Sequence, residues 1–122
     1  MKTFLLLGSL NAFLGVSLGA FGAHGLKNRI SQEMLKVWET AVFYHLVHAL
    51  ALLAIGQLCQ MFPEANLLRP AGWSLTAGIV LFSGSLYLMV LVNVRALGMI
   101  TPFGGVAFLI GWLTLMIAIA KM

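Results

Sequence analysis

Charge is scarce in this sequence, and aspartate is absent from it. Only 8% of the 122 residues are charged, against roughly 25% in an ordinary soluble domain. Hydrophobic residues make up 61% of the chain, and a water-soluble fold of this size cannot hide so much apolar surface. The sequence therefore predicts a single membrane-embedded domain over residues 1–122, surrounded by the lipid bilayer.

Cysteine is scarce, and dense positive charge is lacking. Cys59 is the only cysteine, which excludes an internal disulfide and a metal site built from cysteines. The basic residues are scattered at the ends of apolar stretches, where lipid headgroups and topology account for them. No basic stripe offers a surface for nucleic acid, so we expect no nucleic-acid partner.

Motifs that carry enzyme chemistry are missing as well. The chain has no evident Ser-His-acid set and no Gly-rich phosphate loop followed by a lysine. The closely spaced glycines near the amino terminus lie inside an apolar stretch, where contact between helices explains them better. We therefore expect no enzyme activity, no catalytic residue, no cofactor and no bound metal.

Four long apolar stretches are what the sequence does contain. A spanning helix needs about 20 mostly apolar residues, and an open sheet cannot cross a bilayer. The predicted helices cover residues 3–23, 32–61, 71–94 and 102–121. Their short connections favour antiparallel neighbours, which predicts an all-α membrane protein, a four-transmembrane-helix bundle running up-down-up-down. The run after Lys2 exceeds a normal signal core and lacks a clear cleavage motif, so we expect a retained first helix.

The predicted helix ends carry chemical signals. Ser31 is a good cap for the second helix, because its hydroxyl can accept a hydrogen bond from a first-turn amide. Pro63 and Pro70 bracket the second loop and are expected to stop the helices on either side. Thr101-Pro102 suits the start of the fourth helix, since proline is tolerated at the first helical position.

The orientation of the bundle follows from a small difference in basic residues. The side with the first and third loops carries Lys27, Arg29, Lys36 and Arg95. The side with both termini and the second loop carries Lys2, Arg69 and Lys121. The positive-inside rule therefore favours first and third loops that are cytoplasmic.

Small residues recur along three of the four predicted helices. They let neighbouring helices approach closely in a membrane, where packing replaces the missing hydrophobic drive. The candidate packing positions are Gly15, Gly19, Gly22, Gly84, Gly104 and Gly111. Packing within one chain is the favoured interpretation, and a seam between copies in a homo-oligomer is the alternative.

Polar residues inside the membrane are costly, so each needs an explanation. His45 and His48 are three residues apart and share one face of the second helix. Antiparallel topology places His24, Glu39 and Tyr87 toward the same half of the bilayer. Hydrogen bonding between helices is the favoured interpretation. Proton or small-solute handling and a metal or haem site are the alternatives.

Several ordered blocks of the chain resemble a known family. They are Gly19–Lys27, Trp38–Leu53, Phe82–Leu88 and Thr101–Gly105, with Gly111-Trp112 behind them. The order and spacing are similar to the membrane proteins grouped as domain of unknown function 423, which includes YgdD-like bacterial inner-membrane proteins and eukaryotic transmembrane protein 256. The resemblance implies a four-helix protein of the bacterial inner membrane and no established reaction. It also implies that Gln often stands at the position of His45, which favours His48 as the more important imidazole.

The glycines around His24 fit the end of the first helix in this family pattern. Gly22 and Gly25 would permit the left-handed turn that often ends a helix. His24 could then cap carbonyl groups or reach toward the second helix. We hypothesise a hydrogen-bonded polar cluster near the first loop. Its members are His24, Glu39, His48 and Tyr87.

Three functions are compatible with these patterns. A structural or accessory membrane component, in a homo-oligomer or a larger membrane complex, agrees best with the small size and the glycine positions. A proton or small-solute carrier or channel would need an oligomer, because one four-helix bundle has little room for a path. A quinone-, haem- or lipid-binding membrane protein is the remaining alternative.

Overall fold

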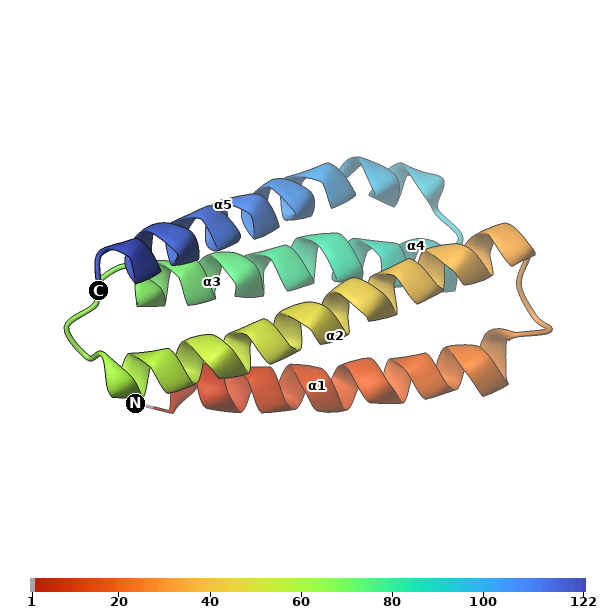
Figure 1. Ribbon diagram of the computed structural model, residues 1–122. Coiled ribbons are helices and arrows are strands. Elements are labelled where there is room, and N and C mark those ends of the chain that lie inside the picture. The colour runs from red at the N-terminus through yellow and green to blue at the C-terminus, as the bar shows by residue number, and fades with distance from the viewer. Residues whose placement is uncertain (1) are drawn as a thin grey trace.

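Four antiparallel helical rods make up the computed structural model, which describes residues 2–122 (Figure 1). The helices are α1 (Thr3–Phe21), α2 (Gln32–Met61), α3 (Leu68–Gly78), α4 (Gly84–Val92) and α5 (Thr101–Ala120). Short π-helical turns extend α1 over Gly22–Leu26 and join α3 to α4 over Ile79–Ser83. A 3₁₀ turn, Arg95–Met99, precedes α5. Both labelled chain ends lie at the same end of the bundle.

Each rod is long and apolar enough to cross a bilayer. The four candidate spans are Thr3–Leu26, Gln32–Met61, Leu68–Val92 and Arg95–Ala120. Large apolar side chains are exposed on all four of them, such as Leu6, Phe43, Leu88 and Leu109. Water would penalise this surface, whereas acyl chains accept it. The predicted all-α, four-helix membrane fold is confirmed.

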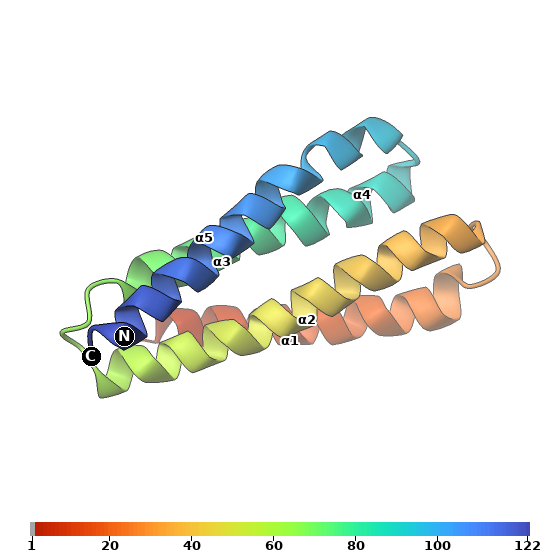
Figure 2. The same ribbon diagram turned by 45° about the horizontal axis from the view of Figure 1, so that its top comes forward.

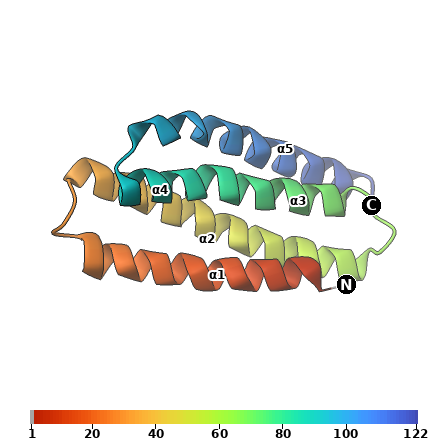
Figure 3. The same ribbon diagram turned by 180° about the vertical axis from the view of Figure 1, so that it is seen from behind.

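The rods are not equivalent in their packing. α2 lies at the centre, with α1 on one side and α3 and α4 on the other, and α5 packs on α3 and on the π-helical turn that follows it (Figures 2 and 3). α1 is therefore an edge helix. Only 17% of its most apolar window is buried, the smallest share of the four spans.

Two apolar clusters fill the interior, one toward each end. The cluster on the side of the termini includes Phe4, Leu52, Ile55 and Leu75. The cluster toward the first loop includes Met34, Trp38, Ala41 and Val90. On α2 the two clusters are separated by His45 and His48, which are the buried polar side chains of this helix and lie at the middle of the bundle.

The end of the first rod differs from the sequence-based expectation. Among residues 2–122 no glycine has a positive φ, so Gly22 and Gly25 do not form a left-handed turn. The chain stays right-handed and continues as a π-helical turn. Gly22 is instead where the Trp38 ring of α2 comes so close that a Cβ would meet it. The left-handed residue is Asn93, with φ 54°, at the end of α4.

The start of the third rod also differs. α3 begins at Leu68, so Pro70 lies inside its first turn instead of in the preceding loop. Proline is tolerated there because the first amide groups of a helix have no carbonyl partner within the helix. Two other predicted helix starts are confirmed. Ser31 Oγ accepts a hydrogen bond from the Met34 amide at 3.1 Å, and α5 begins at Thr101 with Pro102 in its first turn.

One ion pair crosses the first-loop end of the bundle. Arg95 Nη2 donates to Glu33 Oε1 at 3.0 Å, and both side chains are largely exposed. Exposed pairs of this kind contribute little to stability. We expect Arg95→Gln and Glu33→Gln, alone or together, to leave thermal unfolding in detergent unchanged within error. A clear coupling between the two changes in a double-mutant cycle would contradict this expectation.

Candidate functional site

A hydrogen-bonded triad joins three rods at the middle of the bundle. His45 on α2 contacts Asn11 on α1 through Nε2, at 2.8 Å from Oδ1, and Tyr87 on α4 through Nδ1, at 2.9 Å from the hydroxyl oxygen. His45 and Tyr87 are buried, and Asn11 is half-buried. We call Asn11, His45 and Tyr87 the central triad.

The donors and acceptors of the central triad have one consistent direction. Asn11 Nδ2 donates to the Leu7 carbonyl at 2.8 Å, so its Oδ1 faces His45 as an acceptor. His45 Nε2 must then carry the proton, which leaves Nδ1 as the acceptor for the Tyr87 hydroxyl. The series of hydrogen bonds runs from Tyr87 through His45 to Asn11 and ends on the Leu7 carbonyl of α1. It binds helices together and leaves no donor or acceptor of the imidazole unused.

His48 forms a second, separate junction. Its Nε2 accepts a hydrogen bond from Trp112 Nε1 of α5 at 2.9 Å, and its Nδ1 donates to the Tyr44 carbonyl at 2.7 Å. Indole nitrogen is only a donor, so Nε2 carries no proton and the ring is neutral. The imidazole also stacks on Phe108, with centroids 3.6 Å apart and planes at 11°. His45 and His48 are thus held in opposite tautomers.

Trp112→Phe tests the second junction. The change keeps an aromatic ring but removes the donor, which leaves His48 Nε2 unpaired in an apolar interior. We expect a loss of about 1–2 kcal/mol in the free energy of unfolding, in the range for an unsatisfied buried acceptor. The measurement is reversible unfolding in micelles followed by circular dichroism. Trp73→Phe, on a tryptophan that is 48% exposed, is the matched control. Equal effects of the two changes would contradict the assignment.

Further hydroxyl and indole groups tie the rods to one another. Ser83 Oγ donates to the Ala41 carbonyl at 2.8 Å, and Trp38 Nε1 donates to the Leu18 carbonyl at 2.8 Å. Ser74 Oγ donates to Ala107 in the same way at 2.7 Å. Within residues 2–122 every buried side-chain nitrogen or oxygen has a hydrogen-bond partner. The buried polar groups of this part of the chain are therefore satisfied by hydrogen bonds within and between its own helices.

The hypothesised polar cluster does not form as a unit. His24 and Glu39 are exposed near the first loop, away from the buried imidazoles. Tyr87 donates to His45 instead of His48, whose two ring nitrogens are both occupied by other groups. His48 and Tyr87 are buried in the middle of the bundle, but in different networks.

Sequence reasoning underrated Asn11 and His45. Asn11 is the deepest polar side chain of the first predicted helix, and His45 is buried in the second. Deep polar groups on different helices of an otherwise apolar chain must find one another, because unpaired ones are costly. That rule could have paired them. The family pattern instead drew attention to His48.

Most of the candidate packing glycines lie at tight helix contacts. A Cβ on Gly15 would meet Leu46 at 2.6 Å, and one on Gly111 would meet Leu75 at 2.6 Å. Gly19 faces Val42, Gly22 faces Trp38, and Gly104 faces the backbone of Phe82. Gly84 is the exception, because its nearest neighbour, the Ile79 carbonyl at 3.8 Å, belongs to its own rod.

Further close contacts involve glycines outside this candidate set. Gly8 and Gly56 occupy the α1–α2 contact, where Gly8 faces Leu53 and Gly56 faces the backbone of Leu5. The α1–α2 contact is thus lined by glycine on both helices. No three His, Cys, Asp or Glu side chains in the described part of the chain lie close enough to hold a metal ion.

Comparison with known proteins places this fold in a family. Residues 18–105 match the family described as protein of unknown function (DUF423). The chain is 49% identical to the UPF0382 membrane protein YwdK of Bacillus subtilis (strain 168) over 121 residues, which is 99% of this chain and 98% of the relative. It is 52% identical over the same length to a UPF0382 membrane protein of Staphylococcus aureus (strain bovine RF122 / ET3-1), with 99% and 98% covered.

A UPF0382 membrane protein of Staphylococcus epidermidis (strain ATCC 12228 / FDA PCI 1200) gives the same values, 52% identity with 99% and 98% covered. No solved structure matches the chain. The family match spans the first loop, the central triad residues His45 and Tyr87, and the start of α5. This chain is a small integral membrane protein that belongs to the DUF423 family.

Proposed function

We propose that this protein is a non-enzymatic structural or accessory component of a larger membrane assembly. The observation that supports this proposal is the complete internal pairing of buried polar groups within residues 2–122. A preformed, internally satisfied bundle presents a rigid apolar surface to its surroundings. Such a surface suits a helix–helix interface in the membrane, where packing drives association.

A carrier or channel is less well supported. A path for protons or solutes needs polar side chains that face water along its length. The groups of the central triad face one another, and His48 is closed off by Trp112 and by the ring of Phe108. Transport through this region would have to break these bonds. The accessory role keeps them intact.

The outer face of α1 is the proposed partner surface. α1 packs mainly on α2 and has the smallest buried share of the four spans. Phe13 and Val16 lie exposed on this face together with Ser9 and Ser17. The two hydroxyls donate to carbonyl groups one turn earlier in the same helix, at 2.8 Å, so exposing them to lipid costs little free energy. Their small side chains would let a partner helix approach α1 closely.

The proposed location is the bacterial inner, or plasma, membrane, which the chain crosses several times. The relatives named above are bacterial proteins described as membrane proteins. The excess of basic residues supports cytoplasmic first and third loops. A cysteine-accessibility experiment at Lys27 and Lys121 in intact cells tests this orientation, because the two positions lie on opposite sides of the bundle.

Photo-crosslinking tests the accessory role. Benzoylphenylalanine replaces Phe13 on α1 or Leu109 on α5, two side chains that are 69% and 70% exposed. In native membranes we expect one discrete product from position 13 and only lipid adducts from position 109. Mass spectrometry of the product identifies another membrane protein or a second copy of this chain. Lipid adducts alone from both positions, with His48-dependent proton flux in liposomes, would overturn the proposal in favour of a carrier.

A further inference from the structure

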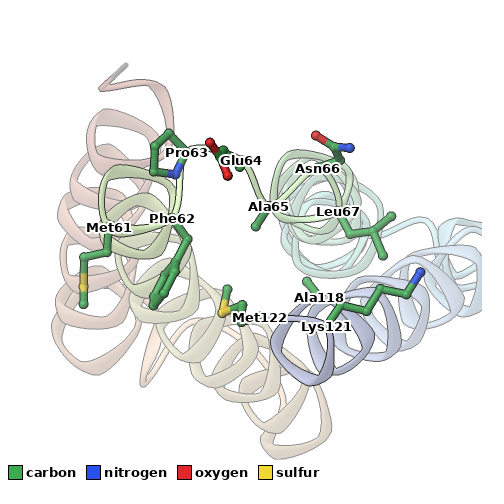
Figure 4. Close-up of a pocket in the computed structure, with 10 residues that line it drawn as sticks. All are labelled: Met61, Phe62, Pro63, Glu64, Ala65, Asn66, Leu67, Ala118, Lys121 and Met122. Atoms are coloured by element: carbon green, nitrogen blue, oxygen red, sulfur yellow. The ribbon is translucent and has the colours of Figure 1, made fainter.

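A pocket opens at the end of the bundle that carries both termini (Figure 4). It lies between the last turns of α2 and α5 and the connection before α3. Its volume is about 730 Å³, within the range of about 300–1,000 Å³ that is usual for ligand sites. Nothing in the central triad or at His48 takes part in it.

The position of the pocket relative to the bilayer follows from the helix ends. α2 ends at Met61 and α5 ends at Ala120, and both helices are candidate spans. The pocket therefore lies at the boundary between acyl chains and headgroups. Its inner wall includes Ala118, which belongs to the buried apolar cluster on the side of the termini.

The apolar part of the lining is incompletely covered. Met61, Phe62 and Met122 all line the pocket and all remain exposed. Phe62 and Met122 extend into the space between the ends of α2 and α5 (Figure 4). Apolar surface left against water or headgroups is unfavourable, by about 25 cal/mol for each Å². An acyl chain lying between the two helix ends would cover these three side chains.

The polar part of the lining carries both signs of charge. Glu64 supplies a carboxylate and Lys121 an ammonium group, and they lie on different sides of the pocket (Figure 4). Glu64 and Lys121 form no ion pair with each other in the described part of the chain. An anionic headgroup would be attracted by Lys121 and repelled by Glu64. A headgroup that carries a phosphate and an ammonium group complements both.

We propose that this pocket binds one ethanolamine phospholipid from the adjacent leaflet. The phosphate faces Lys121, and the primary ammonium group donates hydrogen bonds to Glu64. A choline headgroup has the same net charge but no N–H donor, so it satisfies the carboxylate less well. One acyl chain lies against Phe62 and Met122. The proposal is independent of the partner surface on α1.

Native mass spectrometry of the protein released from micelles tests this site. The probes are phosphatidylethanolamine, phosphatidylglycerol and phosphatidylcholine with identical acyl chains, supplied in equal amounts. We expect preferential retention of one phosphatidylethanolamine. Glycerophosphoethanolamine, which lacks acyl chains, distinguishes the lipid from its free headgroup, and we expect it not to be retained.

Charge variants assign the retained lipid to the pocket. Glu64→Gln should weaken phosphatidylethanolamine binding by about two- to fivefold, as for one exposed ion pair, without weakening phosphatidylglycerol. Lys121→Gln should weaken both. Lys27→Gln and Glu39→Gln, exposed at the opposite end of the bundle, are the matched controls and should change neither. Equal retention of the three lipids, no effect of Glu64→Gln, or a dimer that excludes lipid would overturn the proposal.

Discussion

Gly104→Ala is expected to destabilise the bundle by about 2–3 kcal/mol, at the upper end of the cost of overpacking. A Cβ at this position would fall on the backbone of Leu81 and Phe82, 2.6 Å from the Phe82 Cα, in the π-helical turn between α3 and α4. Backbone atoms cannot rotate away as a flexible side chain can. The α5 helix would have to move off the third rod, and the Ser74 bond to Ala107 would lengthen with it.

Gly105→Ala is the control, one residue further along the same helix. An added Cβ there meets nothing within 4 Å. Both changes replace glycine with alanine in α5, so both receive the same gain in helix propensity, about 1 kcal/mol at most. We expect Gly105→Ala to be neutral or slightly stabilising in reversible unfolding in micelles. Similar stabilities of the two variants would show that α5 does not pack on the third rod at Gly104.

His45→Leu is expected to cost about 2–4 kcal/mol of unfolding free energy. The change removes the acceptor for the Tyr87 hydroxyl and the donor for Asn11 Oδ1 together. Each polar group left unpaired in the interior costs about 1–3 kcal/mol, and the net loss is smaller where the same groups also find partners in the denatured state in the micelle. Reversible unfolding in micelles, scored by circular dichroism, measures the loss.

His45→Gln separates the hydrogen bonds from the imidazole. A carboxamide has an NH2 group that donates and a carbonyl oxygen that accepts, so it can donate to Asn11 and accept from Tyr87 as His45 does. We expect this variant to retain stability within about 1 kcal/mol of the natural chain, the worth of one ordinary hydrogen bond. A glutamine variant as unstable as the leucine variant would contradict this role.

The four helical rods could be predicted from the sequence because short stretches of sequence determine where each helix forms. Uncharged apolar runs of sufficient length have one solution in a bilayer, and Ser31 and Pro102 mark helix starts by their own chemistry. The effect of a proline depends on how far it lies from the start of its helix. Pro70 was misjudged because the predicted start of this helix, residue 71, was three residues too late. The role of Gly22 was misjudged because it depends on Trp38, a partner on another helix.

The partner of Tyr87 could not be predicted from the sequence in the same way. Which side chains face each other depends on the rotation of each helix about its axis. The π-helical turn Ile79–Ser83 adds a residue to one turn, which rotates everything after it by roughly 100° relative to a regular helix. Tyr87 lies beyond this turn, so regular periodicity could not establish whether it faces His45 or His48.

Nitrogen-15 NMR of the histidine rings in the folded protein at neutral pH most directly tests the claim that His45 and His48 are held as opposite neutral tautomers. His45 carries its proton on Nε2 and His48 carries its proton on Nδ1, because their partners are Asn11 Oδ1 and the Trp112 indole. We expect two neutral rings with opposite tautomers, assigned through the His45→Gln and Trp112→Phe variants. Identical tautomers, averaging between the two forms, or a charged ring at either position would contradict a bundle in which the helices themselves satisfy the hydrogen bonds of both buried imidazoles.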